Sequence, residues 1–164
     1  MAEMELLGIK LELPSNIPIV MLRELQGDQR VLPIFIGLPE ANAIHLALEG
    51  RAPARPLTHD LLVDVLTDLG VRLERVEITD LDEGTFYAEL HLSGPGGSHV
   101  VSARPSDGVA LAVRVGAPIF AAEAVLDEAA APVAPEDEEE AESDEVVEQF
   151  REFIEQVNPE DFGS

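Results

Sequence analysis

Residues 99–120 read HVVSARPSDGVALAVRVGAPIF, a stretch that predicts a strand, a sharp polar turn and a helix. The two valines before the turn are β-branched and favour a pleated backbone. Pro105 fixes its own φ, and Ser106 follows it where a helix N-cap is expected. Apolar residues then recur at helical spacing up to Gly116, a residue type suited to ending a helix. The stretch therefore predicts that three polar side chains gather at one strand-to-helix corner: Arg104, Ser106 and Asp107.

The same layout occurs upstream in residues 30–50, which read RVLPIFIGLPEANAIHLALEG. Pro39 corresponds to Pro105 and Gly50 to Gly116, with an offset of 66 residues in each case. The constant offset indicates an internal duplication of a strand–hairpin–helix unit. Two copies are too few for a solenoid. The sequence therefore predicts an α+β fold in which two duplicated units form one domain.

Composition divides the chain into three parts. Of the 164 residues, 46% are hydrophobic, which is enough to form a core, and residues 1–128 are predicted to be the folded domain. Residues 129–143 change to Ala, Pro and acidic residues, which predicts a disordered acidic linker. Residues 144–164 are predicted to contain a C-terminal amphipathic helix, whose apolar stripe is Val146, Val147, Phe150, Phe153, Ile154 and Val157. Because so short a helix is marginal alone in water, we expect it to dock on its own domain, a sister subunit or another protein.

The formal net charge is −23, and residues 132–164 hold 13 acidic residues against one basic residue. This balance counts against tight non-specific binding of nucleic acid, which relies on Lys and Arg. It leaves open a nucleic-acid enzyme whose site uses metal ions as the counter-charge. There is no Cys, hence no disulfide or thiolate chemistry, and we expect a cytoplasmic protein. No apolar run is long enough to cross a bilayer, so no membrane partner is expected.

A second proline-led corner, Arg55-Pro56-Leu57-Thr58-His59-Asp60, opens a helix predicted over residues 57–69. Thr58 is the expected N-cap. The buried stripe of this helix is predicted to be Leu61, Leu62, Val65, Leu66 and Leu69. His59 adds a group that titrates near neutrality and can act as an acid, a base or a metal ligand. The alternative is an ordinary helix start with a half-exposed histidine.

The first corner also has a purely structural interpretation. Ser106 and Asp107 can cap a helix while Arg104 pairs with a nearby carboxylate, and these residues alone favour that interpretation. Glu40 stands at the corner that the duplication matches to Ser106, so Glu40 and Asp107 could approach one cleft across a pseudo-dyad. The helix dipole alone also explains a Glu there. His45 is interpreted as a packing residue, and no role is assigned to His91 or His99.

Three pieces of the sequence together resemble the bifunctional nuclease family, also called the domain of unknown function 151 family. They are Pro39-Glu40-Ala41, Arg55-Pro56-x-Thr58-His59-Asp60-Leu61-Leu62 and Ala103-Arg104-Pro105-Ser106-Asp107. The resemblance covers about residues 4–128, and it implies an α+β domain that tends to dimerise. Plant relatives are described as cutting both RNA and DNA. Gly108 departs from the Ala that family members often carry.

With the clustered Arg, His and Asp residues, the resemblance predicts a nuclease that hydrolyses phosphodiester bonds of RNA or DNA with a divalent cation, Mg²⁺ or Mn²⁺. The expected metal ligands are the carboxylates of Glu40, Asp60 and Asp107, since Mg²⁺ prefers oxygen ligands. His59 is the expected general base or acid, which with those three carboxylates completes the catalytic set. The expected substrate contacts are Arg55, Thr58, Arg104 and Ser106.

A second hypothesis is a non-enzymatic module. In this interpretation the domain is a dimeric scaffold or regulatory module, and the C-terminal helix recruits a protein partner. The acidic charge and the tether of residues 129–143 favour it, because a tether raises the effective concentration of the helix near its partner. Under both hypotheses the predicted assembly is a homodimer.

Overall fold

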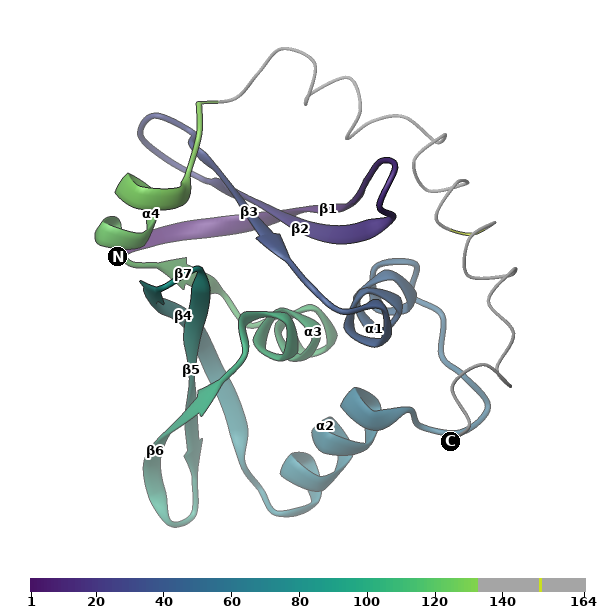
Figure 1. Ribbon diagram of the computed structural model, residues 1–164. Coiled ribbons are helices and arrows are strands. Elements are labelled where there is room, and N and C mark those ends of the chain that lie inside the picture. The colour runs from purple at the N-terminus through teal and green to yellow at the C-terminus, as the bar shows by residue number, and fades with distance from the viewer. Residues whose placement is uncertain (133–150, 152–164) are drawn as a thin grey trace.

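The computed structural model describes residues 1–132 and Arg151, and it shows one α+β domain built on a seven-stranded mixed sheet (Figure 1). The strand order is β3-β2-β1-β7-β4-β5-β6. The strands are β1 (Ala2–Glu12), β2 (Ile17–Glu24), β3 (Val31–Phe35), β4 (Arg72–Asp82), β5 (Thr85–Gly94), β6 (Gly97–Ala103) and β7 (Ile119–Ala121). The helices are α1 (Leu38–Leu48), α2 (Thr58–Asp68), α3 (Pro105–Val115) and α4 (Glu123–Ala129). The predicted α+β class is confirmed.

One order of elements occurs twice along the chain. β1, β2, β3 and α1 form an antiparallel meander followed by a helix, and β4, β5, β6 and α3 repeat that order. The edge position of β3 agrees with Pro33, which lacks the N–H that a central strand needs. Between the two meanders lies β7, antiparallel to β1 and parallel to β4. β7 could not be predicted from the sequence, because its three residues carry too little alternation.

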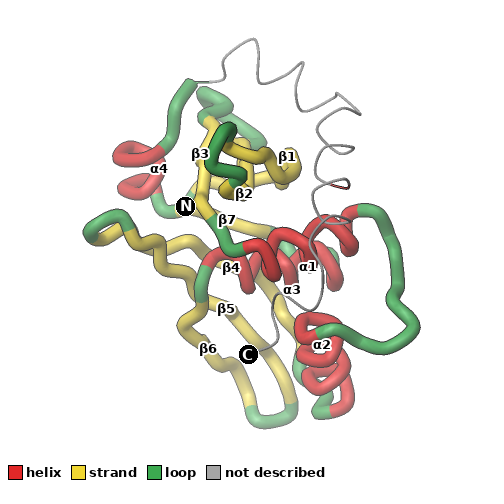
Figure 2. The backbone as a smooth tube through the Cα atoms, turned by 45° about the vertical axis from the view of Figure 1, so that its right-hand side comes forward, coloured by secondary structure: helices red, strands yellow, loops and turns green. Residues whose placement is uncertain are grey.

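The helices α1, α2 and α3 lie on the same side of the sheet, and α3 is the central one (Figure 2). It packs against α1, α2, β4 and β5, and residues 108–112 on it are all buried. Gly108 allows close approach to the sheet, because a Cβ there would lie 2.7 Å from Val76 Cγ1. Gly116 ends α3 with φ 70°, in the left-handed region that favours glycine.

Three details of helix α2 and the helix starts differ from the sequence predictions. Arg104 is the N-cap of α3 and Leu57 that of α2, so Ser106 and Thr58 lie inside their helices rather than capping them. The stripe predicted to be buried on α2 is wrong in four of its five residues: Leu61, Leu62, Val65 and Leu69 are exposed. The side of α2 that faces α3 is instead formed by His59, Asp60, Val63 and Leu66, which are half-buried.

The described domain continues past residue 128. Ala129 ends α4, and Ala131 exchanges backbone hydrogen bonds of 2.8 and 2.9 Å with Val31. Arg30 holds α4 in place, because its guanidinium contacts Glu123 and Asp127 as well as the buried Glu24. Most of the predicted linker (129–143) and of the predicted C-terminal helix (144–164) lies outside the described residues. Within the described part, none of the helices is long and apolar enough to span a bilayer.

Candidate active site

The proline-led corners of the two halves meet in space. Arg104 donates from Nη2 to Glu40 Oε1 at 2.9 Å, and from Nε to Asp107 Oδ2 at 2.8 Å. Pro39 and Pro105 each lie in the first turn of their helix, α1 and α3, where a missing N–H costs nothing. The same turns hold Glu40 and Asp107, so both carboxylates sit at the positive ends of helices. One arginine therefore joins two acids that are 67 residues apart in the sequence.

The corner of residues 55–60, which opens α2, brings a histidine to the same place. His59, in the first turn of α2, has its Nε2 atom 2.8 Å from Asp107 Oδ1. An ionised carboxylate only accepts, so Nε2 carries the proton and Nδ1 is left as the second ring nitrogen. The His59 side chain is 12% exposed and Arg104 is 65% exposed. The cluster thus runs from a nearly buried imidazole through Asp107 to a guanidinium in solvent.

Asp60 lies on the same turn but has a different environment. Its Oδ1 accepts a 2.8 Å hydrogen bond from Arg114 Nε, and its Oδ2 accepts one of 3.0 Å from the backbone N–H of Leu57. Arg114 also donates to the backbone carbonyls of Ala110 and Ala43, at 2.8 and 3.0 Å. Arg114 therefore ties α3 to α1 and α2. The sequence analysis did not assign it to the site, although a lone arginine in an apolar helix was the available signal.

Charge complementarity keeps the two aspartates ionised. Burial by itself raises the pKa of the Asp107 carboxyl, but hydrogen bonds from Arg104 and His59 outweigh it, and the net pKa is below the ordinary value. The hydrogen bond from Arg114 lowers the pKa of Asp60 against a smaller opposing effect of burial. Arg104, in turn, has its pKa raised by Asp107 and Glu40, so it stays cationic.

The remaining predicted substrate contacts are not part of this hydrogen-bonded cluster. Ser106 is buried in the first turn of α3, whereas Thr58 and Arg55 are exposed. Within residues 1–132 and Arg151, Arg55 makes no hydrogen bond or ion pair, so its guanidinium faces solvent on the loop before α2.

A different group of side chains has the geometry to hold a metal ion. Glu77 of β4 is paired in register with Glu89 of β5, and His91 lies two residues further along the same face of β5. Ligand atoms of all three lie within 4.8 Å of one another, with His91 Nε2 3.0 Å from Glu77 Oε2 and 3.6 Å from Glu89 Oε2. Among the described residues, no other trio of acidic or histidine side chains meets this criterion. This group could not be predicted from the sequence, because it depends on the register between β4 and β5.

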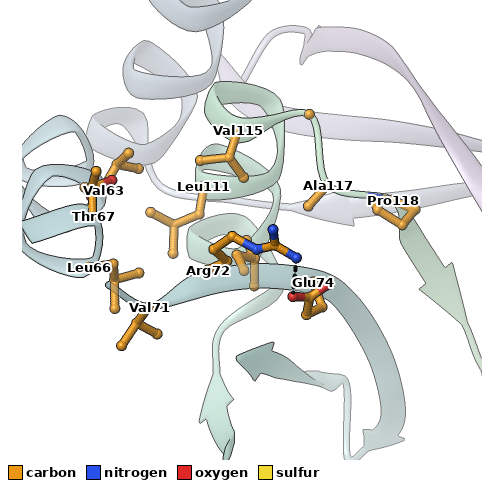
Figure 3. Close-up of a pocket in the computed structure, with 12 residues that line it drawn as sticks. Val63, Leu66, Thr67, Val71, Arg72, Glu74, Leu111, Val115, Ala117 and Pro118 are labelled. Atoms are coloured by element: carbon orange, nitrogen blue, oxygen red, sulfur yellow. Dashed lines mark hydrogen bonds and ion pairs between the residues drawn. The ribbon is translucent and has the colours of Figure 1, made fainter. Parts of the chain in front are cut away.

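Two hollows lie outside the hydrogen-bonded cluster. One, of about 290 Å³, opens between α2, α3 and β4, and Figure 3 shows Leu66, Leu111 and Val115 on its apolar wall. The ion pair between Arg72 and Glu74 (3.0 Å) lies on its polar side. The other is a polar hollow of about 540 Å³ near the N-terminus, beside Glu24 and Arg30. Neither is lined by the residues of the three corners.

Comparison with known proteins supplies the family. The model of the bifunctional nuclease domain matches residues 20–134, which include all three corners. An uncharacterised protein of Mycobacterium tuberculosis (strain ATCC 25618 / H37Rv) is 49% identical over 165 residues, covering 99% of this chain and 98% of the relative. Bifunctional nuclease 2 of Arabidopsis thaliana is 30% identical over 112 residues, which are 65% of this chain and 34% of the plant protein.

Bifunctional nuclease 2 of Oryza sativa subsp. japonica is 28% identical over 105 residues, 62% of this chain and 32% of the plant protein. The matched region thus amounts to about a third of each plant nuclease. The family match itself spans well over half of the present chain, from within β2 through α4, and leaves out β1. The chain belongs to the bifunctional nuclease domain family.

Proposed function

We propose that the protein is a nuclease that hydrolyses phosphodiester bonds of RNA or DNA at the cluster of His59, Asp107, Arg104 and Glu40. The observation that carries the proposal is the contact of His59 Nε2 with Asp107 Oδ1, at 2.8 Å, beside an exposed arginine. A histidine held by a carboxylate and placed next to a phosphate-binding group is what hydrolysis of a phosphodiester needs. The names of the plant relatives support the same reaction class.

His59 would act as the general base. Asp107 fixes the imidazole with its proton on Nε2 and stabilises the cation that forms when Nδ1 takes a proton from the attacking water. Burial of the ring, at 12% exposure, restricts its motion and keeps the base in one orientation. Toward His59, Asp107 acts through Oδ1 as the group that orients the ring, while its Oδ2 accepts from Arg104.

Arg104 would bind the phosphate. Its guanidinium can donate two parallel hydrogen bonds to one phosphate. Because the side chain is already 65% exposed, it can rotate from the two carboxylates toward a substrate phosphate without itself leaving a buried position. Arg55, exposed on the next corner, would hold the adjoining phosphate. The two arginines supply local positive charge on a chain whose overall charge repels nucleic acid.

A divalent cation, Mg²⁺ or Mn²⁺, fits the oxygen donors of Glu40 and Asp107, and it would polarise the phosphate and lower the pKa of a bound water. In the structure these carboxylates are neutralised by Arg104, so they become available as ligands when Arg104 turns to substrate. Asp60 fits less well, because Arg114 and Leu57 already occupy its two oxygens. Its role is to hold α2 so that His59 reaches Asp107.

The test is cleavage of single-stranded RNA and DNA by purified full-length protein, with and without Mg²⁺ or Mn²⁺. His59→Asn and Arg104→Gln are expected to lower the rate at least ~100-fold, the effect of losing a general base or a charge-stabilising donor. His99→Asn is the matched control, because it changes an exposed histidine on β6. Equal rates for wild type and His59→Asn would refute the proposal.

The second candidate function is a dimeric scaffold or regulatory module that recruits a partner. It is favoured by the exposed leucines and valine of α2, since a contiguous apolar helix face on a monomer commonly marks an interaction site. Sedimentation of the purified chain tests the predicted homodimer directly. If the chain is a monomer at micromolar concentration and still cleaves nucleic acid, the dimeric-scaffold hypothesis is rejected and the nuclease hypothesis is retained.

A further inference from the structure

The outer side of α2 carries a row of apolar side chains that no part of residues 1–132 covers. Leu57, Leu61, Leu62, Val65 and Leu69 are each between 40% and 63% exposed. At 100° per residue they occupy one continuous arc of the helix, while His59, Asp60, Val63 and Leu66 occupy the opposite side, toward α3. We call these five residues the α2 apolar face. While these side chains stay in water, the folded domain lacks the free energy that burial of leucine and valine side chains contributes.

The chain itself contains a segment of matching character. Residues 144–157 place Val146, Val147, Phe150, Phe153, Ile154 and Val157 on one arc when wound as an α-helix, as long as the α2 face it would meet. Continuous description of the chain ends at Pro132, and the 11 residues 133–143 can span up to ~35 Å when extended. The start of the segment is therefore tethered within about this distance of Pro132.

One residue of that segment is described, and it lies on the domain. The guanidinium of Arg151 is 3.7 Å from Glu49 Oε1, at the C-cap of α1. Glu49 is followed by the loop of residues 50–56 and then by Leu57, the first residue of the α2 apolar face. A helix from Arg151 to Val157 would add ~9 Å, so one directed along this loop would bring the apolar stripe toward α2.

Charge favours the same placement. The segment has five acidic residues and one arginine, and the loop between α1 and α2 carries Arg51 and Arg55 in exposed positions. Asp64 and Asp68 are exposed on the edge of the α2 apolar face that Leu57 and Leu61 form, so the acidic side of a docked segment would avoid that edge and face the arginines of the loop. Glu49 meanwhile receives the segment's only basic residue.

We propose that residues 144–157 form a helix that docks on the α2 apolar face of their own chain, with Arg151 on Glu49 and the acidic side chains beside Arg51 and Arg55. The contact buries the four exposed leucines of the α2 apolar face together with both phenylalanines of the segment. It places carboxylates next to Arg55, so the docked segment competes with any polyanion for that arginine.

The test uses the full-length chain, which has no cysteine of its own. A nitroxide spin label is attached to Gln156→Cys, and amide line broadening is measured by NMR. Amides of α2 and of the loop 50–56 are expected to broaden, and those of Val100 and Val101 on β6 are not. Leu61→Asp, or the pair Phe153→Asp and Ile154→Asp, is expected to remove the broadening, whereas Val100→Asp, at an equally exposed apolar residue, is expected to retain it.

A charge exchange supplies an independent test. Arg151→Glu is expected to lower the ratio of docked to free segment about two- to fivefold, the range of an exposed ion pair, and Glu49→Arg in the same chain is expected to restore it. In a mixed sample, one set of chains carries the spin label without isotope and the other is isotope-labelled wild type, so any broadening there arises between chains. Broadening of α2 in the mixed sample comparable to that in the doubly labelled chain would assign the face to a second copy, and no broadening of α2 in either sample would leave it to another protein. Both results overturn the proposal.

Discussion

Replacing Arg114 tests whether one buried cation holds the three corners together. Arg114→Leu keeps the apolar stem but removes the guanidinium that donates to Asp60, Ala43 and Ala110. The arginine side chain is only 9% exposed, whereas Asp60 is 27% exposed. The variant therefore loses one charge-assisted hydrogen bond between α3 and α2. The carboxylate of Asp60 is left without this partner, and water can hydrate it in part.

The expected cost follows from these burials. Removing one partner of a fully buried pair costs about 3–5 kcal/mol, and the partial exposure of Asp60 reduces this to about 2–4 kcal/mol. For a domain of this size such a loss moves the urea midpoint down by about 1–2 M. Arg114→Lys retains the charge but not the fork of donors, so an intermediate loss is expected.

Urea unfolding followed by circular dichroism measures both variants. Arg72→Leu is the control, because Arg72 is 79% exposed and, among the described residues, is ion-paired with Glu74 alone. The double variant Arg114→Leu with Asp60→Asn should lose less than the sum of the two single losses, since both break one contact. An Arg114→Leu midpoint equal to that of Arg72→Leu would refute the view that this arginine positions α2.

Because hydrogen bonds depress the pKa of Asp107, its contribution to stability is present above the unfolded value of about 4 and is lost as pH falls through the native value, so Asp107→Asn should flatten the fall of the urea midpoint in acid. Gly108→Ala should destabilise α3 by about 1–3 kcal/mol through overpacking on Val76, and adding Val76→Ala should cost less than the sum. His91→Asn should leave the metal dependence of cleavage unchanged, whereas Glu40→Gln should weaken it. If His91→Asn weakened it and Glu40→Gln did not, the cation would be assigned to the group of Glu77, Glu89 and His91 instead.

The order of the elements could be predicted because their signals are local. The proline that opens each helix and the glycine that ends it mark α1 and α3 in the sequence, and the structure has helices there. The offset of 66 residues also paired the corner of Glu40 with that of Asp107, and Arg104 joins these two side chains. Proximity in that case follows from repetition of a layout, which a sequence records.

The rotation of α2 could not be predicted, because it is decided by polar contacts between helices. Hydrophobic periodicity favours turning Leu61, Val65 and Leu69 inward. In the structure the contacts of His59 with Asp107 and of Asp60 with Arg114 require the opposite rotation. Similarly, the group of Glu77, Glu89 and His91 depends on the register between β4 and β5, which no local pattern specifies.

The rotation of α2 has a consequence that links the candidate site to the exposed face. If the leucines of α2 were turned into the domain, His59 and Asp60 would point to solvent, and neither Asp107 nor Arg114 would have its partner. Placing a histidine at the meeting point of α1 and α3 therefore requires an apolar helix face on the surface. An element that covers this face must then leave His59 and Asp107 in place, even where it reaches Arg55. A helix from the same chain meets this requirement, because it can bury the leucines while the other side of α2 continues to present His59.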